Sequence, residues 1–201
     1  MEAQGVFEPA FIRFLRYEFR LGDYVLSTDV NGKFADDQID LKFPGSWQDS
    51  TMWEIYGLEI VNTLRNRAGF ESLSEDQQLV AYDNAAEKLV AKLFQIKKEC
   101  PDIKISDFST RRRFSYGWQL YANGLAGDIL GDSWLGTSNA FISYLNGTKP
   151  IGTSAHELPM VYTAIYAAMH ADNHHFVQSA QYITVRLYEQ MFGYDYSIML
   201  P

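Results

Sequence analysis

The stretch IKISDFSTRRRFSYGWQLYANGLAGDILGDSWLGTSN, residues 103–139, decides the fold of the second half of the chain. It predicts a strand at 103–109, a helix that ends near Leu130, and a second strand at 133–139 that leads into another helix. Strands that alternate with helices at this spacing are typical of parallel sheets with right-handed crossover connections. We therefore predict an α/β arrangement.

The alternation continues toward the C-terminus. KPIGTSA at 149–155 predicts a third strand, and helices are expected at 156–170 and from about 173 to 191. YSIML at 196–200 predicts a fourth strand. Because native proteins normally cover a hydrophobic edge strand, we expect this chain to be truncated or completed by another chain.

The first half of the chain has a different pattern. Residues 24–43 contain two strand-like runs around an Asn-Gly turn and predict a small antiparallel unit. A helix is expected from Met52 to about Arg67, ending before Gly69. Ser74 and Gln77 form a capping-box pattern that opens a helix over 75–99.

Pro101 separates these two patterns. We predict an N-terminal α+β domain over residues 1–101, and we expect residues 102–201 to form the first part of an irregular parallel α/β barrel. Both domains are expected to be partial.

Composition bounds the class of protein. Of the 201 residues, 47% are apolar and 21% charged, as in ordinary globular proteins, and the net charge is −8. This acidic balance argues against nucleic-acid binding, which needs a basic surface. With one cysteine, no secretory signal and no stretch of about 18 apolar residues, we expect a cytoplasmic protein without a membrane span.

Polar residues follow each predicted strand of the second half. Arg111 lies in a run of three arginines after the first strand, Ser138 and Asn139 follow the second, and His156 and Glu157 follow the third. The carboxyl ends of parallel strands share one rim, where ligands bind in such folds. Cations, hydroxyls and an imidazole beside a carboxylate suit an anionic substrate and acid–base or nucleophilic chemistry.

Each of these features also has a purely structural interpretation. A run of arginines is often a solvated surface, and Gly-Thr-Ser segments are common turns and helix N-caps. His170 and His174, four residues apart, define a separate alternative, a zinc-dependent hydrolase. That site lacks the expected glutamate, and the residues between the two histidines indicate a helix break.

Taken together, DFSTRRRFS (107–115), WLGTSN (134–139) and PIGTSAHE (150–157) resemble, in order and spacing, the nicotinate phosphoribosyltransferase family. The upstream segments FRLGDY (19–24) and LKFPGSWQDSTMWEIYGLEIVNTL (41–64) are also similar to that family. The resemblance covers essentially the whole chain. It implies a type II phosphoribosyltransferase-like fold and a dimer with the active site at the subunit interface.

The resemblance also implies the reaction. Members of the family join nicotinate to phosphoribosyl pyrophosphate, with Mg²⁺ and coupled ATP hydrolysis, and release nicotinate mononucleotide and pyrophosphate in NAD salvage. The expected partners are therefore nicotinate, phosphoribosyl pyrophosphate and ATP, together with a second copy of the chain or a complementing chain. No residue is assigned as a metal ligand.

The resemblance further implies residue roles. His156 matches the histidine that ATP phosphorylates, and Glu157 beside it is the second candidate catalytic residue. Phe108 matches an aromatic residue that stacks on the pyridine ring, and Arg111 matches an arginine that faces the phosphoribosyl group or the base. The remaining candidate substrate-binding residues are Arg112, Thr137, Ser138, Asn139 and Thr153.

Ser138 indicates the acid as substrate. The sister nicotinamide-specific enzymes have Asp at this position, and an ionised Asp would repel the carboxylate of nicotinate, whereas a serine hydroxyl donates to it. The family usually has Gly at position 109 and an aromatic residue at position 158, where this chain has Ser109 and Leu158.

Family members also have segments before and after the part matched here, so we expect this chain to correspond to the middle of the enzyme. We expect negligible turnover by the isolated chain. The alternative is a non-catalytic remnant that acts as an interaction module.

Overall fold

The computed structural model describes residues 9–28, 39–153, 155–169 and 174–193. The chain divides into two compact units, residues 1–150 and 151–201, and each is described here by itself. The domain boundary expected at residue 101 remains a prediction.

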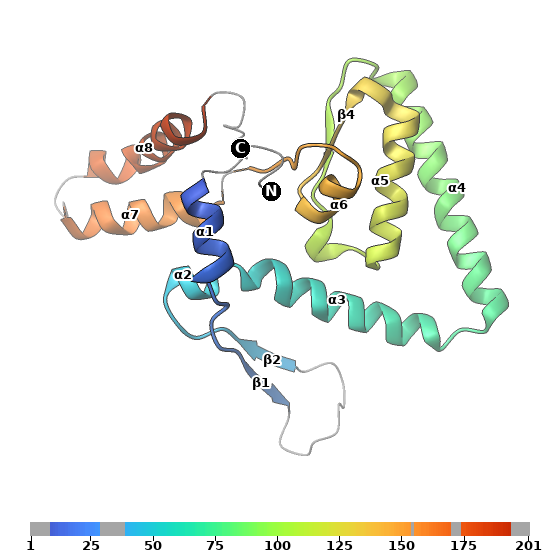
Figure 1. Ribbon diagram of the computed structural model, residues 1–201, viewed down its shortest axis with the longest axis horizontal. Coiled ribbons are helices and arrows are strands. Elements are labelled where there is room, and N and C mark those ends of the chain that lie inside the picture. Colours follow the sequence, from blue (N-terminus) through green and yellow to red (C-terminus); the bar gives the residue numbers. More distant parts are fainter. Residues whose placement is uncertain (1–8, 29–38, 154, 170–173, 194–201) are drawn as a thin grey trace. The chain divides into compact units, whose positions relative to one another are not determined.

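The first unit begins with helix α1 (Pro9–Tyr17) and the strands β1 (Val25–Thr28) and β2 (Ile39–Lys42). The two strands pair antiparallel, with Val25 opposite Lys42, which confirms the unit predicted at 24–43. A short helix α2 (Trp47–Ser50) and the long helix α3 (Trp53–Glu71) follow (Figure 1).

Helix α3 corrects one expected boundary. It continues through Gly69 to Glu71 instead of ending before the glycine. A glycine inside a helix costs about 1 kcal/mol relative to alanine, but it ends a helix only where the backbone turns to positive φ, and Gly69 is not among the positive-φ glycines.

The start of α3 is fixed by aromatic packing. The Trp53 ring stacks on Phe43, with 4.9 Å between centroids, and its Nε1 donates to the carbonyl of Gly22 at 2.8 Å. Gly57, one turn further, is buried and faces the Phe43 ring so closely that an added Cβ would lie 2.7 Å from it. This end of α3 therefore holds a defined position, and it carries two glutamates that matter below.

Helix α4 (Glu75–Glu99) begins at the predicted capping box, in which Ser74 and Gln77 exchange hydrogen bonds. Its Leu93 packs with Ala126 and Leu130 of helix α5 (Tyr116–Leu130) in the core of the unit. Apolar residues at helical spacing thus place α4 and α5 side by side (Figure 1).

Strands β3 (Ile105–Asp107) and β4 (Trp134–Thr137) pair in parallel and are connected through α5, as the strand–helix–strand pattern predicts. Both are shorter than expected. The sheet ends at the same edge for both strands, because Asp107 lies opposite Thr137. The residues that follow the two strands therefore lie next to each other at the carboxyl edge of the sheet.

The segment after the short helix α6 (Ala140–Leu145) contains a correction. The third strand predicted at 149–155 is wrong, because its described residues form no strand. A strand needs a neighbour to complete its hydrogen bonds, and Pro150 lacks the N–H that a ladder requires.

The second unit contains the two helices expected there, α7 (Glu157–Met169) and α8 (His174–Phe192). The fourth strand predicted at 196–200 lies outside the described residues, as does His170, and the side chain of His174 is not described. The alternative zinc site is therefore untested.

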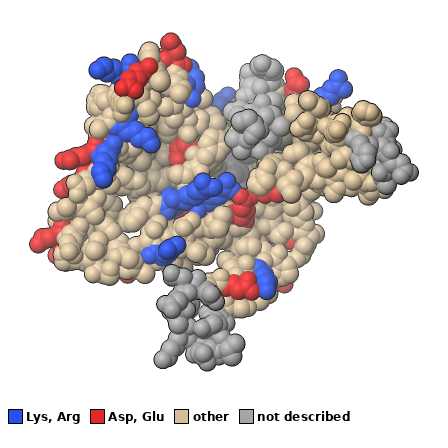
Figure 2. All heavy atoms as spheres, turned by 180° about the vertical axis from the view of Figure 1, so that it is seen from behind, with Lys and Arg blue, Asp and Glu red and all other residues tan. Residues whose placement is uncertain are grey.

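None of the described helices combines the length and the apolar character needed to cross a membrane. On the face drawn in Figure 2, most of the surface is uncharged, and the described Lys and Arg residues lie in small groups next to acidic ones.

Candidate functional site

The Asp107 carboxylate lies at the carboxyl edge of the parallel sheet and accepts four hydrogen bonds. The Ser109 backbone N–H donates to Oδ1 at 2.8 Å. Oδ2 accepts from the Gln119 amide at 2.7 Å, the Asn123 amide at 3.0 Å and the Thr137 hydroxyl at 2.8 Å. One side chain thus connects the ends of β3 and β4 to helix α5.

The ionised form of Asp107 is the favoured one. Burial raises the pKa of this carboxyl, but the hydrogen bonds from Ser109, Asn123, Gln119 and Thr137 outweigh burial and hold the pKa below its ordinary value. Hydrogen bonds of this kind stabilise the charged form because all four groups are donors.

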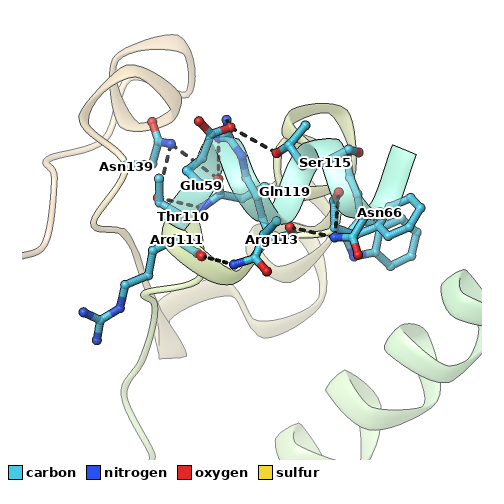
Figure 3. A network of polar contacts seen from close by, with 12 residues as sticks. Glu59, Asn66, Thr110, Arg111, Arg113, Ser115, Gln119 and Asn139 are labelled. Atoms are coloured by element: carbon cyan, nitrogen blue, oxygen red, sulfur yellow. Dashed lines mark hydrogen bonds and ion pairs between the residues drawn. The ribbon is translucent and has the colours of Figure 1, made fainter. Parts of the chain in front are cut away.

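Gln119 extends the network toward α3. Its Oε1 accepts from the Arg113 guanidinium at 3.0 Å, so its amide nitrogen is left to face Asp107. Arg113 in turn pairs with Glu59 and covers the ring of Tyr116, with 5.2 Å between the guanidinium carbon and the ring centroid. Figure 3 shows this succession of side chains from α3 to the sheet edge.

Asn139 closes the network on the side of β4. Its amide nitrogen donates to Thr110 Oγ1 at 3.3 Å and to Gln119 Oε1 at 3.4 Å, while its Oδ1 accepts from the first N–H groups of α6 (Figure 3). Asn139 is therefore both the N-cap of α6 and a contact between the two loops that follow the strands.

The three consecutive arginines have different environments. The Arg113 side chain is only 11% exposed and is enclosed by the pair with Glu59, so it supports the structure. Arg111 pairs with Glu54, and Figure 3 shows its side chain directed away from the network. Arg112 is exposed. Of these three arginines, Arg111 and Arg112 thus remain candidates for contact with an anion.

The turn that holds these arginines is attached to α3. The Asn62 amide donates to the Arg111 carbonyl at 2.7 Å, and the Asn66 amide donates to the Phe114 carbonyl at 3.2 Å. Two asparagines one turn apart therefore fix the backbone of residues 111–114.

Phe108 and Ser138 occupy corresponding places after the two strands. Phe108 is 44% exposed, so its ring is available to a ligand, and the Ser138 N–H donates to the Asp107 carbonyl at 2.8 Å. Ser109, where the family usually has glycine, has φ −86°, a value that any residue adopts. Serine therefore fits at this position without backbone strain.

Thr137 differs from the other predicted binding residues in this unit. It is 1% exposed, and its hydroxyl donates to Asp107 and accepts from the Asn139 N–H at 3.1 Å. These contacts occupy the hydroxyl within the protein.

The remaining predicted site residues belong to the second unit. The His156 side chain is 65% exposed at the start of α7, and its Nε2 lies 3.4 Å from Glu157 Oε1. Thr153 is half-buried in the preceding segment. The structure brings together the predicted residues after β3 and β4, and the expected gathering of His156 with them stays a prediction.

Sequence reasoning missed Asp107, Gln119 and Asn123 as site residues. A signal was present, since Gln119, Asn123, Ala126 and Leu130 follow one another at helical spacing and all four are buried. Amide side chains in the apolar stripe of a helix require polar partners. The aspartate at the end of the preceding strand is one such partner, and it accepts from both amides.

Comparison with known proteins shows which family the region around this network resembles. The nicotinate phosphoribosyltransferase (NAPRTase) family matches residues 103–198, which include β3, α5 and β4. Solved structures extend the likeness of fold to most of the chain. That of the nicotinate phosphoribosyltransferase from Porphyromonas gingivalis has a TM-score of 0.70 at 24% identity over 92% of this chain.

Two further solved structures agree. The nicotinate phosphoribosyltransferase from Vibrio cholerae has a TM-score of 0.70 at 22% identity over 93% of this chain. A Saccharomyces cerevisiae protein assigned to the same activity has a TM-score of 0.66 at 25% identity over 96%. The chain spans only 42%, 41% and 45% of these three proteins. Residues 103–198 thus match the nicotinate phosphoribosyltransferase family, and the solved structures extend the similarity of fold to most of the chain.

Proposed function

We propose that this chain forms part of a nicotinate phosphoribosyltransferase that joins nicotinate to phosphoribosyl pyrophosphate. The observation that carries the proposal is the joint position of Phe108, Arg111 and Ser138, which follow two parallel strands tied together at Asp107 within the region that matches the family. An exposed aromatic ring, a cation and a hydroxyl suit an aromatic acid and a phosphorylated sugar.

In this proposal the ring nitrogen of nicotinate attacks C1 of the ribosyl group, and the bond from C1 to the pyrophosphate oxygen breaks. Pyrophosphate leaves with the electron pair. Phe108 stacks on the pyridine ring and holds it for attack, while Arg111 and Arg112 bind the phosphorylated sugar. Asn139 and Thr137 hold Ser138 in place, and Thr153 contacts substrate.

ATP hydrolysis is assigned to His156. A neutral imidazole attacks the γ-phosphorus of ATP, the bond to the bridging oxygen breaks, and ADP leaves; water later releases phosphate from the histidine. Glu157 orients the ring, since its Oε1 lies 3.4 Å from Nε2. Overall, nicotinate, phosphoribosyl pyrophosphate, ATP and water give nicotinate mononucleotide, pyrophosphate, ADP and phosphate.

Mg²⁺ enters this proposal on the phosphates of the substrates. In the described part of the first unit, the carboxylates beside the candidate site are engaged: Asp107 accepts four hydrogen bonds, and Glu54 and Glu59 pair with arginines. These residues do not fit a protein-held metal, and no step is assigned to one.

The surface of the first unit supports a protein partner, either a second copy or a complementing chain. Large apolar side chains are exposed along α3 and α4, among them Leu58 at 46%, Leu64 at 56%, Leu79 at 63% and Phe94 at 56%. Exposed apolar residues in this number are typical of surfaces that other chains cover.

The decisive experiment introduces a negative charge at position 138. Formation of nicotinate mononucleotide is measured with the chain alone and with a second chain that supplies the remaining length of the solved relatives. Ser138→Asp is expected to lower kcat/KM for nicotinate at least tenfold, because the new carboxylate repels that of the substrate. Ser27→Asp on exposed β1 makes the same chemical change and is expected to have no effect.

Two results would contradict the proposal. The first is equal use of nicotinate by Ser138→Asp and wild type. The second is the absence of any phosphoribosyl transfer in both preparations, which would favour the interaction module. Loss of ATP coupling in His156→Ala, with unchanged activity in His175→Ala, is the expected result for the phosphorylation step.

A further inference from the structure

The Asp107 carboxylate joins two segments that come from different strands. We name residues 108–111 the β3 loop and residues 137–139 the β4 loop. Oδ1 accepts from the backbone of Ser109 in the β3 loop, and Oδ2 accepts from the side chain of Thr137 in the β4 loop. The Asp107 carbonyl also accepts from the Ser138 N–H, so both the main chain and the side chain of this residue bind the β4 loop.

We propose that Asp107 is a positioning residue that sets the spacing between the β3 loop and the β4 loop, and thereby the preference for an aromatic acid over its amide. This rests on the proposed function, in which Phe108 of one loop stacks on the substrate ring and Ser138 of the other donates to its carboxylate. A shift between the loops moves the hydroxyl relative to the ring.

Asp107 itself takes no part in binding or proton transfer. Its four hydrogen-bond donors surround both oxygens, and all of them come from the protein. Oδ2 accepts three of these hydrogen bonds and Oδ1 accepts the fourth, so both oxygens are engaged inside the protein. We therefore assign this carboxylate a geometric contribution.

The Asp107 side chain needs an acceptor at both of its oxygen positions. Oδ2 accepts from two amide nitrogens and one hydroxyl, and Oδ1 accepts from the Ser109 N–H. In Asp107→Asn, an NH₂ group at the Oδ2 position would face three donors, whereas the reversed amide keeps an oxygen there and turns its NH₂ group against the Ser109 N–H. The first orientation loses the hydrogen bond from the β4 loop and the second loses that from the β3 loop, so the substitution is expected to separate the loops.

The test measures backbone amide exchange and ligand preference in the full chain. The N–H groups of Ser109, Ser138 and Asn139 report on the two loops, because each donates a hydrogen bond that belongs to this connection. In Asp107→Asn, exchange at these three amides is expected to rise at least tenfold, with unchanged exchange at Leu93 in the core. Asp128→Asn, which removes an exposed carboxylate on helix α5, is the matched control.

Binding of nicotinate and of nicotinamide is measured on the same variants. Asp107→Asn is expected to reduce the ratio of the two affinities at least fivefold. A purely structural defect lowers the folded fraction of the protein. It therefore reduces the affinities for both ligands by the same factor and leaves their ratio unchanged. An unchanged ratio together with unchanged loop exchange overturns the proposal.

Thr137→Val gives a second, gentler test, which also decides the question where Asp107→Asn does not fold. It removes the hydroxyl that donates to Oδ2 and accepts from the Asn139 N–H, so exchange at Asn139 rises directly and Ser138 is the informative amide. Exchange at Ser138 is expected to rise while that at Ser109 stays as in the wild type; equal rises at Ser138 and Ser109 contradict the proposal. Wild-type protein that binds neither ligand refutes the proposed function, whereas the exchange pattern still decides the positioning role.

Discussion

The same three residues, Gly-Thr-Ser, occur at 136–138 and at 152–154, and the glycine and threonine of the two copies, which the structure describes in both, differ in structure. In the first, Gly136 is buried in β4 with φ +116° and Thr137 bonds to Asp107. In the second, Gly152 is exposed and outside any strand, and within the described residues the Thr153 hydroxyl has no hydrogen-bond partner. The first copy is ordered by a partner strand that presents a carboxylate, so the conformation of such a segment depends on its tertiary partner.

Replacing the charged Asp107 side chain by a neutral one should have the largest effect on the free energy of unfolding. Asp107→Asn is expected to destabilise the chain by roughly 2–4 kcal/mol, because even the better amide orientation leaves the Ser109 N–H without an acceptor and removes the charge from the other three hydrogen bonds. Thermal or denaturant unfolding measures the change. Asp128→Asn should differ from the wild type by less than about 0.5 kcal/mol, and a similar small change in Asp107→Asn would show that the carboxylate does not order the first copy.

The glycines offer a direct comparison between the copies. Gly136→Ala is expected to cost up to about 3 kcal/mol, since its φ of +116° lies where side chains are strained. Gly152→Ala should change stability by less than about 0.5 kcal/mol, because an added Cβ meets nothing within 4 Å. Equal effects in unfolding experiments would erase the distinction drawn between the two segments.

The threonines sharpen the same comparison. Thr137→Val is expected to cost about 1.5 kcal/mol, the loss of a buried hydrogen bond to a charged group, whereas Thr153→Val should be close to neutral. The isosteric change keeps side-chain volume, so unfolding free energies report the hydroxyl alone. A costly Thr153→Val would indicate a partner for the second copy.

Low pH should reduce the stability of the first copy, because it protonates the Asp107 carboxylate to which Thr137 donates. The folded-state pKa of Asp107 is lowered, so its contribution is complete above its unfolded pKa of about 3.9 and is lost as the pH falls through the folded value. The stability difference between wild type and Asp107→Asn is therefore expected to be constant near pH 6 and to shrink below about pH 4. A pH series of unfolding curves tests this, and a difference that does not shrink as the pH falls below about 4 contradicts it.

Local signals in the sequence predicted much of the fold. The capping box at Ser74, the antiparallel pair at 24–43 and the parallel pair around α5 all follow from spacing and turn chemistry. The strand expected at 149–155 did not form in its described residues, because apolar runs predict strands only where a neighbour completes the ladder.

The candidate site was predicted less completely. Phe108 was expected inside the first strand and follows the shorter β3, while Arg111 and Ser138 follow β3 and β4, and the buried residues that hold them depend on packing between α3, α5 and the sheet. The contrast between Arg111 and Arg113 shows the reason. The sequence presents them as equivalent, and the contacts with Glu59, Gln119 and Tyr116 make Arg113 internal.

The amide of Gln119 has a direction, with its oxygen toward Arg113 and its nitrogen toward Asp107. Gln119 thus offers an acceptor to one neighbour and a donor to the other. Glutamate has no donor for Asp107, and lysine has no acceptor for Arg113. Natural substitutions at position 119 should consequently occur together with changes at 107 or 113. A redesign that changes the charges at this edge of the sheet must alter all three positions together.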